Sequence, residues 1–323
     1  MGRSPRRGRR LARVDEEARV WVAGSGTPVG SALVRALERR GAARLVGVGA
    51  DPDFTDAAAV EAAFAALAPD YVFVAAGRAG GIGLNQREPA GLMRDNLLVS
   101  AHVLEAAHRR RVRKLLYLAS SCAYPRDCGQ PMREDALMTG PLEPTSAPYA
   151  LAKLAGLTLC QAYRRERGSP FVAAIAGDSF GPGDVFDPDD AHVVAALMAR
   201  MHRARAADAP TVEVWGTGTP RRDFVFVDDL AEACLCVMEG YDDPAPINLG
   251  GGGELSIAEL ASLIGEVVGY RGAIRFDPRR PDGAPRKALD GSRVAALGWR
   301  PRTSMREALE ITYREFLKSE AEA

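Results

Sequence analysis

The sequence predicts an α/β fold, built on a doubly wound parallel sheet with a smaller, interleaved C-terminal domain. Short apolar runs alternate with longer amphipathic stretches between residues 19 and 120, and a glycine-rich segment, "AGSGTPVGSA", follows the first run. This alternation is typical of strands and helices in βαβ units, which pair their strands in parallel and place helices on both faces. Ligands of such sheets bind beyond the carboxyl ends of the strands.

The first elements can be placed from the sequence in chain order. Four apolar runs predict strands, at residues 19–24, 44–49, 71–77 and 114–120. Three segments between them have the periodicity of amphipathic helices, at residues 31–41, 57–69 and 96–111. The first strand therefore ends at the glycine-rich segment, and the fourth ends at "SSCAYP".

The chain divides into a leader and two interleaved domains. Residues 1–18 are charged and punctuated by Gly and Pro, which predicts a disordered leader. Residues 19–178 form the predicted nucleotide-binding domain, and residues 179–323 form most of the second domain. The segment near residues 211–240 is expected to return to the main sheet.

Composition excludes several classes of partner. The chain has 42 basic and 42 acidic residues, so no net charge attracts nucleic acid or an anionic membrane. No run approaches the roughly 20 apolar residues that span a bilayer, and no apolar segment of a secretory signal follows the basic N-terminus. Cysteines at positions 122, 128, 160, 234 and 236 show no metal-ligand or disulfide spacing. We expect a cytoplasmic protein without a bound metal.

The glycine-rich segment predicts a phosphate-binding loop of the Rossmann type. Glycines let the chain turn tightly and let a pyrophosphate approach the backbone at a helix N-terminus. A plain turn is the alternative, but the position between a strand and a helix favours a dinucleotide. The predicted contacts are Gly24, Gly26, Thr27, Pro28, Val29 and Gly30. After the second strand, Asp53 and Phe54 are candidates for the adenine end, or simply part of a loop before a helix.

A second group of reactive residues follows the fourth strand. Ser120 ends that strand, and Tyr149 and Lys153 are four residues apart, so they share one helix face. An ammonium group lowers the pKa of a nearby phenol, which can then exchange a proton with an oxygen that Ser120 holds. A Tyr–Lys pair at this spacing is common on solvated helices. Beside the loop and the serine, it predicts chemistry at a carbonyl or hydroxyl group.

These segments resemble the extended short-chain dehydrogenase/reductases, and most closely the GDP-L-fucose synthase family. The matching segments run in order from about residue 19 to the C-terminus: "AAGRAGGI", "SSCAYP", "LEPTSAPYALAKLAG", "WGTGTPRRDFVFVDD", "SIAELA" and "FDPRRPDGAPRKALD". The resemblance implies a 3,5-epimerase and 4-reductase of GDP-4-keto-6-deoxy-D-mannose that uses NADPH. It also implies a homodimer paired through helices near residues 96–108 and 148–163.

The resemblance further implies which residues react. Ser120, Tyr149 and Lys153 would act at the carbonyl, and Cys122 and His192 would act in epimerisation. A 4-keto group acidifies the hydrogens at C3 and C5, and inversion removes a proton from one face of the ring and returns one to the other. Two acid/base groups on opposite sides of the ring meet that need. The alternatives are a packing role for the cysteine and a surface or capping role for the histidine.

Further contacts are implied by the resemblance. The residues at the GDP portion or its phosphates would be Arg200, Trp215, Arg222 and Lys287. Arginine forks and a lysine charge fit phosphate oxygens, whereas surface charges and a core aromatic are the alternatives. The cofactor would also contact Ala75, Ala76, Gly77, Ala176 and Ser179, together with the tyrosine and lysine of the reactive group.

Three departures from the family pattern bear on cofactor and substrate. Thr27 stands at a glycine position, which gives a GxGxxxG order. Gly26 and "GVGA" stand where the family has arginines for NADPH, and Asp51 follows, so NAD(H) remains open. "AGD" at 176–178 replaces Pro-Thr-Asn, and its carboxylate leaves open another nucleotide-linked ketosugar of natural-product or heptose pathways, with or without reduction. A non-catalytic nucleotide-sugar-binding protein is the remaining alternative.

Overall fold

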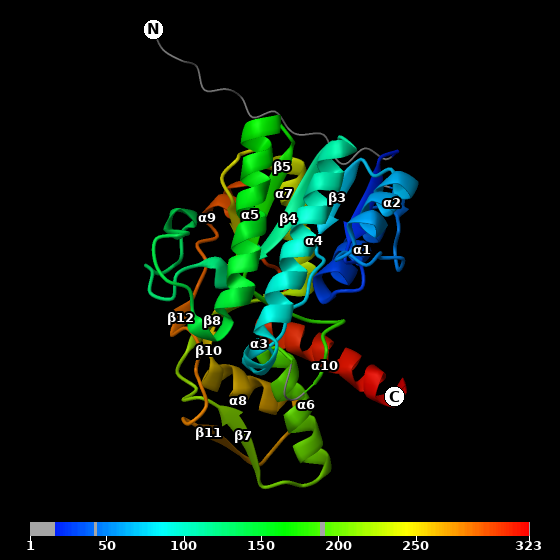
Figure 1. The fold of residues 1–323 in the computed structure, drawn as a ribbon. Coiled ribbons are helices and arrows are strands. Elements are labelled where there is room, and N and C mark those ends of the chain that lie inside the picture. The colour runs from blue at the N-terminus through cyan, green and yellow to red at the C-terminus, as the bar shows by residue number, and fades with distance from the viewer. Residues whose placement is uncertain (1–16, 42–43, 188–190, 323) are drawn as a thin grey trace.

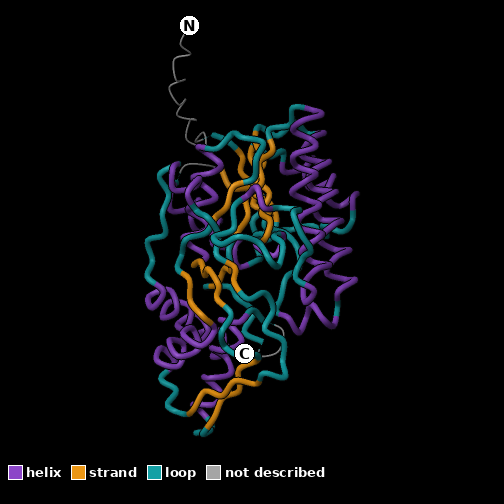
Figure 2. Tube along the Cα trace, turned by 90° about the vertical axis from the view of Figure 1, so that its left-hand side faces the viewer, coloured by secondary structure: helices purple, strands orange, loops and turns teal. Residues whose placement is uncertain are grey.

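A six-stranded parallel sheet between two helical layers forms the larger part of the computed structural model (Figures 1 and 2). The structure describes residues 17–41, 44–187 and 191–322. The predicted leader lies outside the described residues except for its last two, of which Ala18 is buried at the start of the core. The strands, in order across the sheet, are β2 (Arg44–Val46), β1 (Arg19–Ala23), β3 (Tyr71–Val74), β4 (Lys114–Ser120), β5 (Phe171–Ala176) and β9 (Ile247–Leu249).

Helices cover both faces of this sheet, as the sequence predicts. One face packs against α1 (Pro28–Arg40) and α7 (Val227–Gly240), and the other against α2 (Ala57–Leu67), α4 (Pro89–Arg109) and α5 (Ala147–Arg167). Strand residues alternate between the two cores: Val20 and Val22 belong to the first, whereas Trp21 and Ala23 belong to the second. In Figure 1, α4 and α5 lie on the near side of the sheet and α7 lies on the far side. The predicted fold class is confirmed.

The smaller part of the molecule lies below the carboxyl ends of the strands in Figure 1. A four-stranded sheet contains β6 (Asp178–Phe180), β8 (Arg221–Phe226), β10 (Glu254–Ser256) and β12 (Arg286–Lys287), and β7 (Thr211–Trp215) pairs with β11 (Ala273–Asp277). The remaining helices are α3 (Ile82–Arg87), α6 (Val193–Ala206), α8 (Ile257–Val268), α9 (Ser292–Ala296) and α10 (Met305–Glu322). Short 3-10 turns occur at Ser121–Ala123, Glu134–Ala136 and Pro144–Ser146.

The segment at 211–240 rejoins the main layers only through its helix. The sequence predicts that it returns to the main sheet, but β7 and β8 pair with strands of the smaller part, whereas α7 packs against α1. The strand that joins the parallel sheet is β9, beside β5. The short β9, which reads "INL", is fully buried beside β5, whereas the charged start of β8 is paired with β10 and β12 of the smaller part.

Local chemistry sets the bounds of two further elements. The second strand is shorter than predicted because Gly47 and Gly49 have φ angles of +69° and +72°, which leave the extended region. The first helix begins at Pro28, before its predicted start, because the Thr27 side chain caps it by accepting a hydrogen bond from the Gly30 N–H at 3.0 Å.

The order of the strands fixes where a ligand binds. The chain leaves β1 for β2 on one side and returns to β3 on the other, so the connection reverses direction between β1 and β3. Adjacent loops diverge at such a switch point and leave a crevice at the carboxyl ends of the strands. The glycine-rich loop after β1 and residues Ala75–Gly77 after β3 lie at that point.

Candidate active site

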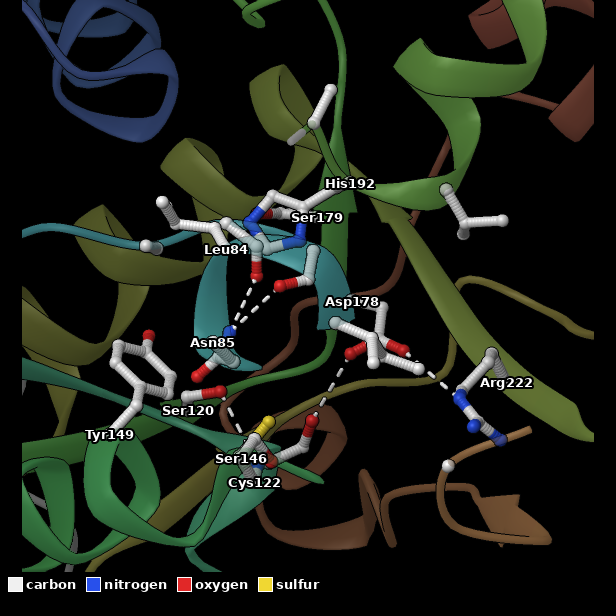
Figure 3. A pocket seen from close by; sticks show the side chains of 18 of the residues that line it. Leu84, Asn85, Ser120, Cys122, Ser146, Tyr149, Asp178, Ser179, His192 and Arg222 are labelled. Carbon is white, nitrogen blue, oxygen red and sulfur yellow. Dashed lines mark hydrogen bonds and ion pairs between the residues drawn. The ribbon is translucent and has the colours of Figure 1, made fainter. Parts of the chain in front are cut away.

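A large cavity, about 770 Å³ in volume, opens at this crevice and reaches into the smaller part of the molecule. Its walls come from the glycine-rich loop, from the residues that follow β3, β4 and β5, and from α5, α6 and the loop before β12. Figure 3 shows part of this cavity with its labelled side chains. Residues from both parts of the fold therefore share one site.

The glycine-rich loop is shaped by close backbone packing. Gly24 has a φ of +90°, and a Cβ atom there would lie 2.4 Å from the Ala76 nitrogen. A Cβ atom on Gly30 would lie 1.9 Å from the carbonyl oxygen of Gly24. By contrast, Gly26 has no neighbouring atom within 4 Å of such a position and lines the cavity with Thr27, Pro28 and Val29. The outer glycines hold the turn, and the middle of the loop faces the ligand space.

The residues present fit a dinucleotide along this wall. The predicted cofactor residues Ala75, Ala76, Gly77, Ala176 and Ser179 all line the cavity. A Cβ atom on Gly77 would lie 3.2 Å from the Lys153 Nζ and 2.4 Å from the Asn96 Oδ1. That Asn96 oxygen is buried and has no hydrogen-bond partner in the described chain. An unpaired acceptor and a buried ammonium suit the hydroxyl groups of a bound nucleoside.

Four predicted cofactor residues do not line this cavity: Gly24 and Gly30, which hold the turn of the loop, and Asp53 and Phe54. The Asp53 carboxylate accepts hydrogen bonds from the Thr55 N–H and hydroxyl at 2.9 and 2.6 Å, in an Asx turn before α2. The Phe54 ring stacks on Trp21, with 6.0 Å between the ring centroids. Both therefore have local structural partners, and their contact with the adenine end stays a prediction.

Ser120 and Tyr149 lie near each other at the end of β4. Burial raises the pKa of the Tyr149 phenol, with a smaller contribution from Cys122, whereas the Ser120 hydroxyl lowers it. Burial also lowers the pKa of Lys153 to about 8. We predicted that this lysine would lower the pKa of the phenol, but desolvation outweighs any such effect. The phenol is therefore held in its protonated form, ready to donate.

Cys122 and His192 lie on opposite walls. Figure 3 shows Cys122 beside Ser120 on one wall and His192 on the other, next to Ser179. His192 stands at the N-cap of α6 but makes no capping hydrogen bond with its side chain. Surrounding protein atoms lower the pKa of the imidazole by desolvation, against the opposing effect of Asp178. The ring is therefore neutral over a wider pH range and can accept a proton.

Asp178 lies between these walls and forms ion pairs with Lys287 and Arg222. Its carboxylate accepts a hydrogen bond from the Lys287 ammonium at 2.7 Å and lies 3.6 Å from the Arg222 Nε. The same ammonium lies 3.7 Å from the Cys122 sulfur. These cations lower the pKa of Asp178 although burial opposes them. Of the residues predicted for the GDP portion, Lys287 thus lies beside Cys122, and Arg222 lies beside Asp178.

The other two predicted substrate residues lie together at another part of the cavity wall. The Arg200 guanidinium stacks on Trp215, with 5.4 Å between its central carbon and the ring centroid. Arg280 lies over the same ring at 4.7 Å. An indole flanked by two guanidinium groups suits a planar base and its phosphates.

Three residues in or beside the cavity had no role predicted from the sequence: Arg280, Asn96 and Asp184. Arg280 lies in a quoted motif but had no assigned role. Asn96 lies among the buried residues of α4 with Leu92 and Val99, and an amide between these apolar positions was the signal. Asp184 lines the cavity, accepts a hydrogen bond from the Gly181 N–H at 3.0 Å, and has a pKa raised to about 6 by burial. Nothing in its glycine-rich sequence context indicates that burial.

Three further predictions from composition concern metal sites, membrane-spanning helices and the cysteines. Within the described ranges, no three His, Cys, Asp or Glu side chains form a group that could hold a metal ion. Among the helices of those ranges, none is long and apolar enough to cross a membrane. All five cysteines are free, and Cys160 and Cys234 are core residues.

This fold and site define a nicotinamide-dependent enzyme class, and comparison with known proteins agrees. The model of the NAD dependent epimerase/dehydratase family matches residues 20–250. GDP-L-fucose synthase 1 of Arabidopsis thaliana is 44% identical over 306 residues, which cover 94% of this chain and 95% of the relative. GDP-L-fucose synthase of Escherichia coli (strain K12) is 43% identical over 312 residues, covering 94% and 97%. The chain belongs to the GDP-L-fucose synthase branch of this epimerase family.

Solved structures show the same architecture. A GDP-L-fucose synthetase from Naegleria fowleri bound to NADP superposes with a TM-score of 0.87 at 25% identity, covering 97% of this chain and 98% of that one. A GDP-6-OMe-4-keto-L-xylo-heptose reductase from C. jejuni superposes with a TM-score of 0.90 at 26% identity, covering 95% and 100%.

Proposed function

We propose that the protein converts GDP-4-keto-6-deoxy-D-mannose into GDP-L-fucose, by epimerisation at C3 and C5 and NAD(P)H-dependent reduction at C4. One observation carries the proposal: a Ser120–Tyr149 pair and a Cys122/His192 pair face one cavity beside a dinucleotide loop. The GDP-L-fucose synthases of Arabidopsis thaliana and Escherichia coli support the same product. We further propose that residues 19–178 hold the cofactor and that most of residues 179–323 hold the sugar nucleotide.

Epimerisation needs two proton carriers on opposite faces of the sugar. The 4-keto oxygen, hydrogen-bonded by Ser120 and Tyr149, would draw electron density from C3 and C5 and make their hydrogens acidic. The neutral imidazole of His192 can remove a proton from one face, and the Cys122 thiol can deliver one to the other. The opposite placement of these residues supports this division. After the first inversion, a proton returns from the imidazolium to the thiolate through solvent, so that the same pair can act at the second carbon.

Reduction needs a proton donor at the same oxygen. The reduced nicotinamide, when bound, supplies the hydride that reaches C4. The phenol of Tyr149, whose pKa is raised by burial, donates the proton that neutralises the developing alkoxide at O4. Ser120 holds that oxygen in place, and the buried Lys153 ammonium adds positive charge near Gly77. Reduction removes the acidity of C3 and C5 and so makes both inversions permanent.

The nucleotide end of the substrate would lie against Trp215 and the two arginines that stack on it. We place the guanine and diphosphate near Trp215, Arg200 and Arg280, because an indole can stack on a base and guanidinium groups bind phosphate oxygens. Arg222 and Lys287 would then serve the sugar-proximal phosphate or the ring hydroxyls, since both contact Asp178.

Deuterium exchange tests the proposal directly. The purified protein is incubated in heavy water with GDP-4-keto-6-deoxy-D-mannose, with and without NADH or NADPH. Deuterium at C3 and C5, together with cofactor oxidation, is the expected result. Cofactor oxidation without exchange would make the protein a simple reductase. If neither deuterium exchange nor cofactor oxidation occurred, the assignment would be overturned and a nucleotide-sugar-binding role would remain.

A second candidate substrate class follows from Asp178. The resemblance places an asparagine there, and a carboxylate changes the hydrogen bonds offered to the sugar. The similarity to the C. jejuni heptose reductase, at a TM-score of 0.90, supports including GDP-4-keto-heptoses in the same assay. Faster turnover of a heptose than of the 6-deoxy-hexose would favour this second candidate.

We also propose a cytoplasmic homodimer. Helices α4 and α5 pack side by side on one face of the sheet, and Leu151 on α5 is 45% exposed. Pairing of these helices with those of a second copy would form a four-helix interface. Sedimentation of the purified chain tests this, and a Leu151→Glu variant that sediments as a monomer would identify the interface.

A further inference from the structure

Asp51 is fixed at the mouth of the glycine-rich loop. Its Oδ1 accepts a hydrogen bond from the Gly24 N–H at 3.1 Å, and its Oδ2 accepts one from the Ser25 hydroxyl at 3.2 Å. The Ser25 oxygen in turn accepts a hydrogen bond from the Gly49 N–H at 3.1 Å. This network ties the residues after β2 to the residues after β1 and holds one carboxylate in a defined orientation.

The carboxylate keeps acceptor capacity for a ligand. An ionised carboxylate has about four acceptor positions, and the two bonds to the loop use two of them. Asp51 is exposed, so the remaining positions are accessible. It follows the last glycine of the loop, Gly30, by roughly 20 residues, the separation at which an acidic residue binds a ribose 2′-hydroxyl in dinucleotide folds.

The segments around Asp51 contain little positive charge that could neutralise a 2′-phosphate. Residues 24–30 contain no basic residue, and residues 44–56 contain only Arg44. Arg44 begins β2, opposite Arg19 in register, and therefore lies at the amino end of the strand, away from the ligand edge. Asp53 and Asp56 add two more carboxylates to the segment that follows.

The first basic residues that follow the loop and β2 in the sequence already bind carboxylates. Arg35, the first basic residue after the loop, pairs with Asp228 at 2.5 Å. Arg78, the first after β2, pairs with Glu88 at 2.7 Å and with Asp95 at 3.1 Å. A 2′-phosphate beside Asp51 would therefore be repelled by the carboxylate, and the arginines that could neutralise it are already paired with other carboxylates.

We propose that Asp51 makes this protein select NAD(H) over NADP(H), in contrast to its NADP-bound structural neighbour from Naegleria fowleri. The carboxylate accepts hydrogen bonds from the 2′- and 3′-hydroxyl groups of the adenosine ribose and repels a 2′-phosphate. This inference rests on the proposed use of a nicotinamide cofactor and adds which form of it is bound.

Equilibrium binding measures the selectivity without depending on turnover. NADH and NADPH are titrated separately into the purified full-length chain, with binding followed by calorimetry or by nicotinamide fluorescence at one fixed ionic strength. We expect NADH to bind at least about 10-fold more tightly, because one contact is gained and one repulsion is avoided. The ratio should narrow as salt is added, since Asp51 is exposed and its repulsion is screened.

Two variants assign the effect to Asp51. In Asp51→Asn the charge is lost with little change of shape, so the affinity for NADPH should rise and the ratio should approach one. Adding Gly26→Arg to it should reverse the preference, because a Cβ atom at Gly26 would meet no atom within 4 Å and the arginine that it carries can supply the positive charge for the phosphate. Asp135→Asn, the same change at a carboxylate of which 75% is exposed, should leave the ratio as it is.

Each outcome decides between the alternatives. Equal or tighter binding of NADPH by the unmodified protein would overturn the selectivity while leaving the proposed enzyme intact. An unchanged ratio in Asp51→Asn would mean that Asp51 only fastens the loop. If neither dinucleotide bound, both the selectivity and the cofactor's role in the proposed function would fall, whereas deuterium exchange at C3 and C5 would still report on the epimerase site.

Discussion

The Lys287 ammonium lies 2.7 Å from the Asp178 carboxylate, and this pair sets the charge between the two walls of the cavity. The pair comes from two distant strand ends, β6 and β12, both of which join β8. Because Asp178 also lies near Arg222, one carboxylate is shared by two cations. Charge at this point acts on both the cysteine and the histidine that we assign to epimerisation.

Asp178→Asn is expected to move the acidic limb of the proton-exchange profile to lower pH. The Asp178 charge favours the protonated form of His192 and so raises the pKa of the imidazole. Without that charge, the neutral base form of His192 persists at lower pH. Deuterium incorporation at C3 and C5, measured from pH 5 to 8 in the variant and the unmodified protein, checks the direction.

Asp184→Asn is the matched control for that profile. Asp184 is the cavity carboxyl whose pKa is raised to about 6, so its own titration could produce an acidic limb. Its side chain is bonded to the Gly181 N–H rather than to Lys287. A limb that moves in Asp184→Asn but not in Asp178→Asn would assign the titration to Asp184 and contradict the role given to His192.

Tyr149→Phe should separate the two half-reactions. The phenol is the proton donor for reduction, so its loss should lower the rate of cofactor oxidation by about 10²- to 10⁴-fold. Exchange at C3 and C5 should persist, because Ser120 still binds the keto oxygen. Tyr270→Phe, in which the lost hydroxyl donates to the Ala209 carbonyl away from the cavity, should change neither rate. Equal losses of exchange and oxidation in Tyr149→Phe would contradict the assignment.

Lys153→Met should stabilise the cofactor-free protein at neutral pH while abolishing reduction. Burial lowers the pKa of Lys153 from 10.5 to about 8, so the unfolded state binds more protons between these values. The stability of the unmodified protein therefore rises with pH across that window, and the cost of the buried charge is complete below pH 8. A shift of this size corresponds to up to about 3 kcal/mol.

Urea unfolding without cofactor at a series of pH values checks this expectation. The advantage of Lys153→Met should be largest near pH 7 and should vanish as the pH approaches 10.5. Lys318→Met replaces a lysine of which 67% is exposed and should show no such trend. A constant destabilisation of Lys153→Met at every pH would show that packing around the side chain, rather than its charge, dominates.

Much of the site could be predicted from sequence because its parts follow local rules. A residue at the end of a parallel strand must face the crevice, which places Ser120, and an i, i+4 pair on one helix must share a face, which places Tyr149 with Lys153. The long-range pairings could not be predicted. Whether β8 or β9 joins the parallel sheet depends on pairings between strands far apart in the chain, and the contact of Lys287 with Asp178 joins residues more than 100 positions apart. Likewise, the raised pKa of Tyr149 reflects burial by the assembled fold rather than its neighbour in the helix.

Gly30→Ala and Gly26→Ala make a matched pair within the glycine-rich loop. A Cβ atom on Gly30 would lie 1.9 Å from the Gly24 carbonyl oxygen, and backbone atoms cannot move aside cheaply. We expect Gly30→Ala to lower the free energy of unfolding by about 3 kcal/mol or more and to weaken dinucleotide binding, since the turn must open. The Cβ atom of Gly26→Ala would meet no atom within 4 Å, so this variant should change the free energy of unfolding by less than about 1 kcal/mol. Chemical unfolding and cofactor titration of both variants check the pair, and similar losses in the two would show that the loop is not held by the contact between Gly24 and Gly30.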